Sequence, residues 1–392
     1  MTTALSGIRH WLVPAAFCMT ASSASAQDLQ HWTLTHDLRI GGLSAENHGL
    51  TYVSDVEVDA QGRVYVAQSQ EKTIRVYDDT GTFLRAIGRG GAGPGEFRRV
   101  DGLGIAAGGV LALDQASNRL TMFSRDGKFI RQWSAPRYDY PPGSYETAPR
   151  TALKDGSLVV IPVYRSQQDS EPARVPILVF DSAGGFRSSA GTLSVGDRSV
   201  RAQSGRLVAV MPQPVSTHTL WGIARDAPAV LLVNRSIGEN ADEQSRFEVV
   251  KISAASGDTL FSRAYRVPTQ PIPAETIERE RDREIDQTTA SRPFPRTIIA
   301  ELYRNGWQFP PFQAPVDRVV GSEDGTVWLR RGSFGQMEST WWVLDRSGTL
   351  IASLTAPTDL NVLRISGTHV WGTQRGQFDQ FHVVRLAIGR TE

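Results

Sequence analysis

Short runs of alternating apolar and polar residues, divided by glycine turns, fill most of the chain. Val64–Val66 and Ile74–Tyr77 have the period of two that places successive side chains on opposite faces of a β-strand. The turns repeat as well, because Gly62, Gly109 and Gly156 stand 47 residues apart each time. A repeat of this length with four short strands is typical of one blade of a β-propeller, whose sheet buries both faces only when neighbouring blades pack against it.

Six such units can be followed along the chain. The first two begin near Asp55 and Gly102, and the third runs from Arg150 to Gly191. The fourth is the least regular and combines "LVAVMPQ", "HTLWGIA", "AVLLVNR" and "FEVVKISAASGDTLFSRAY". The fifth begins at Val316. The sixth begins at Asn361 and ends after three strands, so one strand is missing.

The N-terminal segment supplies a candidate for the missing strand. His31–Gly42, "HWTLTHDLRIGG", has strand patterning but precedes the first complete blade. We expect His31–Ile40 to pair with the strand near His382–Leu386, which closes the ring and removes its exposed sheet edge. The sequence therefore predicts an all-β fold, a six-bladed β-propeller closed by an N-terminal strand.

One glycine-rich stretch allows a second interpretation. Gly88, Gly90 and Gly93 have the G-x-G-x-x-G spacing of a dinucleotide-binding turn, in which backbone N–H groups at the start of a helix hold a pyrophosphate. Pro94 and Gly95 follow, and the next apolar run is too short and too rich in glycine for that helix. We therefore interpret the glycines as turn residues in the link between the first two blades.

The same region resembles a known family. "GTFLRAIGRGGAGPGEFRRVDGLGIAAGGVLALDQASNRLTMFSRDGKFIRQW" is similar to the NHL-type six-bladed propeller, whose repeat joins a glycine-rich linker ending in G-E-F to a blade with a D-G turn. The similarity is specific from about Val53 to Trp133 and generic after Arg150. One departure is Arg99-Val100-Asp101, where the family usually has proline. The resemblance implies an exported propeller that presents one face to a peptide, protein or glycan.

One segment between the fourth and fifth units lacks strand patterning. Pro273–Pro315 includes "AETIERERDREIDQ" and "RTIIAELYRNG", which are rich in helix formers, with Ile298, Ile299 and Leu302 on one helical face. We expect a helical insertion packed on one face of the disc. It could brace the ring or cover a ligand, and apolar side chains at this spacing favour the brace.

The N-terminus indicates export. "MTTALSGIRHWLVPAAFCMTASSASAQ" has a basic start, a short apolar stretch and an A-x-A site, so residues 1–26 read as a signal peptide cleaved after Ala26. The remaining residues, 27–392, form one domain. The apolar stretch is too short for a membrane span. The only cysteine, Cys18, leaves with the signal peptide, so disulfides and thiolate metal sites are not expected in the periplasmic or secreted protein.

The charge composition adds little in favour of a particular partner. The chain has 42 basic and 41 acidic residues, interspersed along its length, so nucleic-acid binding gains no support. Only four of the basic residues are lysine. The excess of arginine could serve anion binding, but genomic composition explains it more simply. We expect a monomer.

Two carboxylates are candidates for a cation site in the central channel. Asp101 and Asp317 each stand eight residues before the turn glycine of their blade, and Ser54 has the same place in the first blade. Related propellers, lactonases and the peptide-amidating lyase among them, bind cations in the channel. Calcium requires six or more oxygen ligands, so these residues are weak candidates for a metal site.

Two functions remain open. The first is an exported, non-catalytic recognition module, for which Arg89, Arg98, Arg99, Asp101, Asp317 and Trp307 are the candidate ligand-binding residues. The second is a calcium-dependent channel hydrolase or lyase of the lactonase or amidating-lyase kind. No catalytic residue can be assigned from the sequence, and no cofactor other than that calcium is expected. The sequence therefore favours the recognition module.

Overall fold

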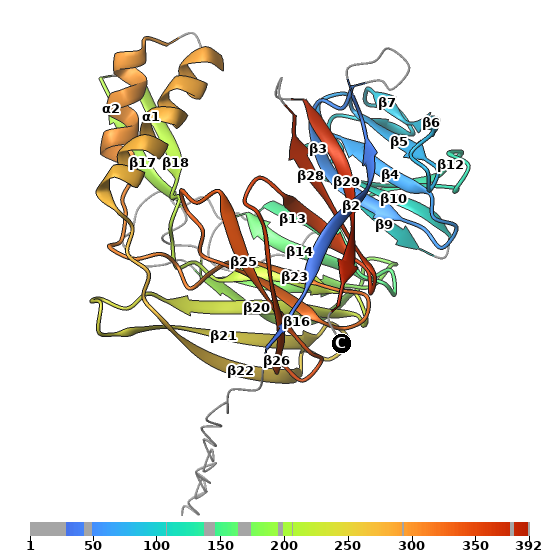
Figure 1. The fold of residues 1–392 in the computed structure, drawn as a ribbon. Coiled ribbons are helices and arrows are strands. Elements are labelled where there is room, and N and C mark those ends of the chain that lie inside the picture. Colours follow the sequence, from blue (N-terminus) through green and yellow to red (C-terminus); the bar gives the residue numbers. More distant parts are fainter. Residues whose placement is uncertain are drawn as a thin grey trace, which may run out of the picture.

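The protein is a six-bladed β-propeller, described here from a computed structural model (Figure 1). The structure describes residues 29–42, 49–106, 108–136, 146–163, 174–194, 199–205, 207–291, 294–376 and 380–390. Each blade has four antiparallel strands, and the first strand of each lines the central channel. The predicted fold class is confirmed.

The strands follow the blade order along the chain. Blade 1 contains β3 (Val53–Val58), β4 (Val64–Gln68), β5 (Thr73–Tyr77) and β6 (Phe83–Ile87). Blade 2 contains β9 (Gly102–Ala106), β10 (Gly109–Asp114), β11 (Arg119–Phe123) and β12 (Phe129–Ser134). Blade 3 contains β13 (Glu146–Ala152), β14 (Leu158–Val163), β15 (Arg174–Phe180) and β16 (Phe186–Ser194). Blade 4 contains β19 (Leu220–Ala224), β20 (Ala229–Ser236), β21 (Gln244–Ser253) and β22 (Thr259–Pro268). Blade 5 contains β23 (Val316–Gly321), β24 (Val327–Arg331), β25 (Glu338–Leu344) and β26 (Leu350–Pro357).

Blade 6 joins the two ends of the chain. It contains β27 (Asn361–Ile365), β28 (His369–Arg375), β29 (Phe381–Gly389) and, as its outermost strand, the N-terminal β2 (Thr33–Ile40). Ile40 lies opposite Val383, which confirms the predicted closure. The sequence did not reveal that β1 (Gln30–His31), just before β2, pairs in parallel with β26 at the edge of blade 5.

Packing between blades explains why the repeat closes into a ring. Six apolar clusters fill the six junctions between neighbouring blades. Between blades 5 and 6, for example, Trp32 packs on Trp328, with ring centroids 5.9 Å apart. Each sheet thus buries apolar side chains on both faces, which no blade achieves alone.

The hairpin turns explain the repeated glycines. In the last turn of blade 5, Asp345 accepts hydrogen bonds from the backbone N–H groups of Ser347 and Thr349, both at 2.8 Å. Between them Gly348 has a φ of 82°. This left-handed conformation favours glycine, because a Cβ atom there meets the neighbouring carbonyl.

The glycine-rich stretch after β6 is a link between blades, as expected. Gly88 has a φ of 73°, and a Cβ atom on it would lie 2.2 Å from the ring of Phe97. Phe97 is fully buried between blades 1 and 2. Two short strands, β7 (Arg89–Gly90) and β8 (Glu96–Phe97), pair in parallel within this link. We call the side of the disc that carries the links between blades the linker face.

Two insertions in consecutive links form one unit beside the ring. The first is the hairpin of β17 (Ser199–Ser204) and β18 (Leu207–Pro212), between blades 3 and 4. The second contains α1 (Ala274–Ser291) and α2 (Arg296–Gly306), between blades 4 and 5, as predicted. Figure 1 shows the four elements gathered together. Their shared core includes Met211, Ile285, Ile299 and Leu302.

This unit corrects the composition of the fourth repeat. "LVAVMPQ" had been expected in blade 4, but it forms β18 and lies outside that blade. Its alternating pattern is satisfied by the helices, because Leu207, Ala209 and Met211 pack in the core around α2, whereas Val208 and Val210 are exposed. α2 accordingly packs on a β-hairpin, whereas α1 also reaches the loop between β24 and β25 of blade 5.

The predicted signal peptide, residues 1–26, lies outside the described residues. Among the helices that the structure describes, none has the length and apolarity to cross a membrane.

Candidate functional site

The central channel holds a cavity of about 380 Å³ lined by residues from all six blades. Its charged residues are Asp55, Asp101, Arg150, Arg225 and Arg318. Two carboxylates therefore face three guanidinium groups. The innermost strands bring these side chains together from positions far apart in the sequence.

Both channel carboxylates are held by backbone groups of blade 2. Asp55 accepts a hydrogen bond from the N–H of Leu103 at 2.9 Å, and Asp101 accepts one from the N–H of Gln115 at 2.7 Å. Burial raises the pKa of Asp55, although the N–H of Leu103 and the charge of Arg225 oppose the rise. Burial raises the pKa of Asp101 in the same way.

Ion pairs cross the channel near the ends of the innermost strands. Glu57, from blade 1, accepts a hydrogen bond from Arg225 of blade 4 at 2.8 Å and a second one from Arg364 of blade 6. Arg364 also pairs with Glu323 of blade 5. Burial lowers the pKa of Arg364 to about 10. These four residues, called here the channel cluster, tie four blades together.

The structure does not bring Asp101 and Asp317 together. Asp101 lines the channel cavity and pairs with Arg99 at 2.5 Å, whereas Asp317 lines a different cavity and pairs with Arg330 at 2.6 Å. The two candidate ligands of a channel cation therefore line separate cavities. Within the described ranges, no three His, Cys, Asp or Glu side chains are grouped as a metal site would require. Ser54 donates to the carbonyl of Val100 at 2.6 Å.

The three linker arginines lie on the linker face but outside both cavities. Arg89 is exposed and pairs with Glu96 at 2.9 Å. Arg98 is exposed, and its backbone N–H donates to Asp114 at 2.8 Å. Their neighbour Arg99 is half-exposed and engaged by Asp101, as described above.

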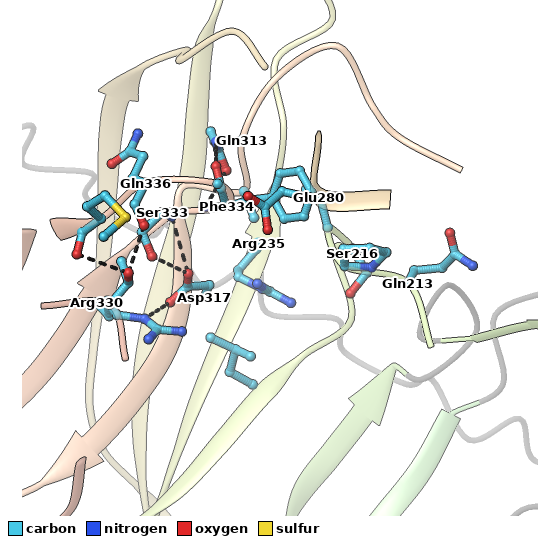
Figure 2. Close-up of a pocket in the computed structure, with 18 of the residues that line it drawn as sticks. Gln213, Ser216, Arg235, Glu280, Gln313, Asp317, Arg330, Ser333, Phe334 and Gln336 are labelled. Carbon is cyan, nitrogen blue, oxygen red and sulfur yellow. Dashed lines mark hydrogen bonds and ion pairs between the residues drawn. The ribbon is translucent and has the colours of Figure 1, made fainter. Parts of the chain in front are cut away.

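A larger cavity, of about 860 Å³, lies between α1 and the linker-face loops of blades 4 and 5. We call it the insertion cavity, and Figure 2 shows part of its lining. Its walls come from the link before blade 4 (Gln213–Leu220), from α1, and from the loop between β24 and β25 (332–337). The insertion therefore covers part of the linker face and creates a recess that the blade repeat alone does not contain.

Asp317 and Arg330 lie together in the lining of this cavity. One oxygen of Asp317 accepts a hydrogen bond from Nε of Arg330, and the other accepts from the hydroxyl and the N–H of Ser333 at 3.2 and 3.3 Å (Figure 2). Arg330 comes from β24 and Asp317 from β23, so two neighbouring strands hold the pair in place.

The loop 332–337 is fixed from two sides. Gln313 bonds both backbone groups of Phe334, donating to its carbonyl at 3.0 Å and accepting from its N–H at 3.2 Å. Arg279, on α1, donates to the carbonyl of Gly335 at 2.9 Å. The loop is therefore held between the helices and the ring, and the cavity wall is preformed.

Further polar groups line the helical side and the link before blade 4. Glu280 of α1 is 6% exposed and pairs with both Arg279 and Arg283. In the link, the hydroxyl of Ser216 lies 2.5 Å from Nδ1 of His218. Apolar side chains, including Val215 and Phe334, complete the lining.

Trp307 supports the cavity without lining it. Its ring packs edge-on against Tyr303 of α2 and against Phe309, with centroids 5.0 and 5.7 Å away. Phe309 in turn packs on Phe334, which does line the cavity. Among the described residues, the indole Nε1 of Trp307 is buried without a hydrogen-bond partner. The predicted site residue is thus two aromatic contacts away from the cavity.

The comparison with family models agrees with the fold. A family model described as DUF5128, a 6-bladed beta-propeller, matches residues 45–141. No curated protein matches the chain. Similar solved structures include a DUF4221 family member from Bacteroides vulgatus (9% identity, TM-score 0.48, covering 92% of this chain and 99% of that one). Regucalcin from Agrobacterium tumefaciens, a calcium-binding protein, has 11% identity and a TM-score of 0.42, with 91% and 96% coverage. A streptogramin B lyase has 11% identity and a TM-score of 0.40, with 93% and 98% coverage. At these scores the likeness carries nothing about chemistry.

Sequence reasoning found Asp317 but not its surroundings. Gln313 and Phe334 lie outside the repeat pattern, and Arg279 and Glu280 sit in a helix whose place on the ring the sequence does not fix. The unusual length of the two links that flank blade 4 was the available signal, because an insertion beside a ring has to pack against something.

Proposed function

We propose that the protein is an exported, non-catalytic recognition module that binds part of a peptide, protein or glycan in the insertion cavity. The observation that carries this proposal is the cavity of about 860 Å³, built by an insertion that the repeat does not require. Its volume is within the range of sites that bind small molecules or segments of larger ones. Apolar walls with a few fixed polar groups suit selective binding without a reaction.

The channel offers less support for the calcium-dependent alternative. Arg150, Arg225 and Arg318 repel a divalent cation from the cavity that Asp55 and Asp101 share. Both carboxylates already accept backbone hydrogen bonds, and calcium would need at least four further oxygen ligands around it. The insertion cavity is therefore the better candidate site.

A plug variant tests the proposal. Gln336 is exposed at the cavity rim, so Gln336→Trp places a large ring there with little effect on stability. Thr340→Trp is the matched control, because Thr340 is exposed further along in β25 and does not line the cavity. Peptide and glycan arrays should yield a ligand that the wild type and Thr340→Trp bind and that Gln336→Trp does not. Equal binding by all three proteins would contradict the proposal.

Export is the remaining part of the proposal. It rests on the basic start, short apolar stretch and A-x-A site of residues 1–26. Sequencing the N-terminus of the protein recovered from its cells should give Gln27 as the first residue. A protein in the cytoplasm that begins at Met1 or Thr2 would contradict export.

A further inference from the structure

Arginines paired with carboxylates line both sides of the insertion cavity. On the helical side, Arg279 and Arg283 both contact Glu280, at 3.3 and 2.6 Å. On the propeller side, Arg330 pairs with Asp317. Arg318 lies behind Arg330, towards the channel. The lining as a whole holds four arginines, Arg235, Arg279, Arg283 and Arg330, against three carboxylates, Glu280, Asp317 and Asp359, so it carries more positive than negative charge.

The arginine on the channel side responds to this crowding. Burial and, to a lesser extent, the charge of Arg330 lower the pKa of Arg318 to about 10, while Asp317 opposes both effects. Arg318 directs its own hydrogen bonds away from Asp317, to Asn361 and to the carbonyl of Val362. The single negative charge of Asp317 thus does not balance the positive charges of Arg318 and Arg330 beside it.

Arg330 has donors to spare. Its side chain is 19% exposed, and its Nε is used by Asp317. Within the described ranges, no residue accepts a hydrogen bond from its two Nη groups. These groups are also not fully buried. Since Arg330 lines the cavity, these groups are available to solvent or a ligand there. Asp317 fixes the orientation of the guanidinium through Nε, and Ser333 holds the other oxygen of Asp317 in place (Figure 2).

We infer that the insertion cavity recognises an anionic group on its ligand, a carboxylate or a phosphate, and that the two Nη groups of Arg330 bind it. This inference rests on the proposed function of the cavity. A planar guanidinium presents paired N–H donors that match two oxygens of such a group. The partly buried setting strengthens the interaction, because water competes less for the donors.

The rest of the lining indicates an organic anion rather than a free inorganic ion. Val215, Leu220 and Phe334 supply apolar surface within the same cavity. Met337 lies at its rim and is 86% exposed, so a flexible apolar side chain is available to cover a bound group. A carboxylate or phosphate attached to an aromatic or aliphatic group fits both features.

Small probes test the anion site directly. Isothermal titration calorimetry would compare N-acetylphenylalanine, its neutral amide and phenyl phosphate, at up to about 10 mM because small probes bind weakly. The wild type should bind an anionic probe and not the amide. Arg330→Gln should weaken that binding on the order of tenfold or more, as expected when a charge-assisted pair is lost. Which anion binds more tightly distinguishes carboxylate from phosphate recognition.

Two further variants serve as controls. Arg246→Gln removes an exposed arginine of β21 that does not line the cavity, and should bind as the wild type does. Arg330→Gln leaves Asp317 without its partner, so the double variant Arg330→Gln/Asp317→Asn replaces the ion pair by two neutral amides. It should fold normally, as judged by circular dichroism, and should also lose the anionic probe.

The possible results separate this inference from the proposed function. The anion site is overturned if no anionic probe binds, if the amide binds equally well, or if Arg246→Gln loses as much binding as Arg330→Gln. An array ligand that Gln336→Trp excludes but Arg330→Gln still binds leaves the proposed function intact and overturns the anion site alone. An array ligand that Gln336→Trp still binds overturns the proposed function, whatever the probes do.

Discussion

The carboxylate of Glu57 in blade 1 lies 2.8 Å from the guanidinium of Arg225 in blade 4, on the far side of the ring. Both side chains are largely buried, at 6% and 15% exposure. Arg364 also contacts Glu57, and it pairs with Glu323 as well, so Glu57 is the carboxylate that the two buried arginines share. Charges in such a setting have no water to replace a lost partner.

Removal of this carboxylate should destabilise the ring. Glu57→Gln leaves Arg225 and Arg364 without their shared counter-charge, and we expect the free energy of unfolding to fall by about 3 kcal/mol. Urea unfolding followed by tryptophan fluorescence measures the change. Glu338→Gln, at an exposed position in β25, is the control and should change little. A similar effect of both substitutions would mean that the channel cluster contributes nothing specific.

Trp32 should matter more than its place near the N-terminus suggests. It is 3% exposed and packs in the cluster between blades 5 and 6. Trp32→Ala opens a large cavity there and should cost about 3–5 kcal/mol of stability. The exposed neighbour Thr33 provides the control Thr33→Ala. An unchanged melting temperature in Trp32→Ala would contradict the role of the N-terminal segment in closing the ring.

Gly335 should be intolerant of a side chain. Its φ is 73°, and a Cβ atom would lie 2.2 Å from Thr276 of α1. Gly335→Ala should therefore push α1 away from the loop 332–337, with faster hydrogen exchange in α1 and weaker ligand binding. Gly205→Ala has a similar φ, 57°, but nothing within 4 Å, so it should cost only the backbone strain of about 1–2 kcal/mol. Equal effects of the two substitutions would show that backbone strain, and not the contact with Thr276, causes the effect of Gly335→Ala.

Asp59 should contribute to the loss of folding stability at acid pH. Burial alone raises its pKa, but hydrogen bonds from Arg63 and Tyr65 outweigh burial and hold the pKa below the usual value of 3.8. Because the folded-state pKa is lower than the unfolded one, the contribution is present above pH 3.8 and is lost as the pH falls through the folded pKa. Asp59→Asn should flatten stability against pH below about pH 4, unlike Asp242→Asn at an exposed position. Unfolding curves across this range that remain parallel to those of the wild type would disprove the assignment.

Calcium should not stabilise the protein. The channel carboxylates Asp55 and Asp101 share their cavity with three arginines. We expect chelator-treated protein to melt at the same temperature with and without millimolar calcium, because there is no binding energy to add to the folded state. A rise in melting temperature that Asp101→Asn abolishes would restore the calcium-dependent enzyme as the leading hypothesis.

The repeat made the ring predictable, since Gly62, Gly109 and Gly156 mark the same turn in successive blades. Closure could be inferred because blade 6 lacked one strand and the N-terminus offered one. Only β18 of the β17–β18 hairpin was predicted, and in the wrong sheet, because alternation in Leu207–Pro212 shows that one face is buried and not what buries it.

The candidate site was less accessible to sequence reasoning. From its distance to Gly325, Asp317 was placed where the first strand of its blade enters the channel, but Arg330 and Ser333 reach it only through the pairing of β23 with β24. Glu57 carries a signal that was overlooked, because a charged residue near the end of an innermost strand needs a partner across the channel.

The pairing of β2 with β29 also bears on the order in which the chain folds. Asp37 and Arg385, which face each other across these strands, are separated by 348 residues along the chain. Contacts this distant in sequence form late, because closing so long a loop is entropically unfavourable until the intervening blades have assembled. β2 is therefore synthesised early but pairs with β29 late in folding. Until then, the edge of β29 and the apolar surface around Trp32 stay open to aggregation.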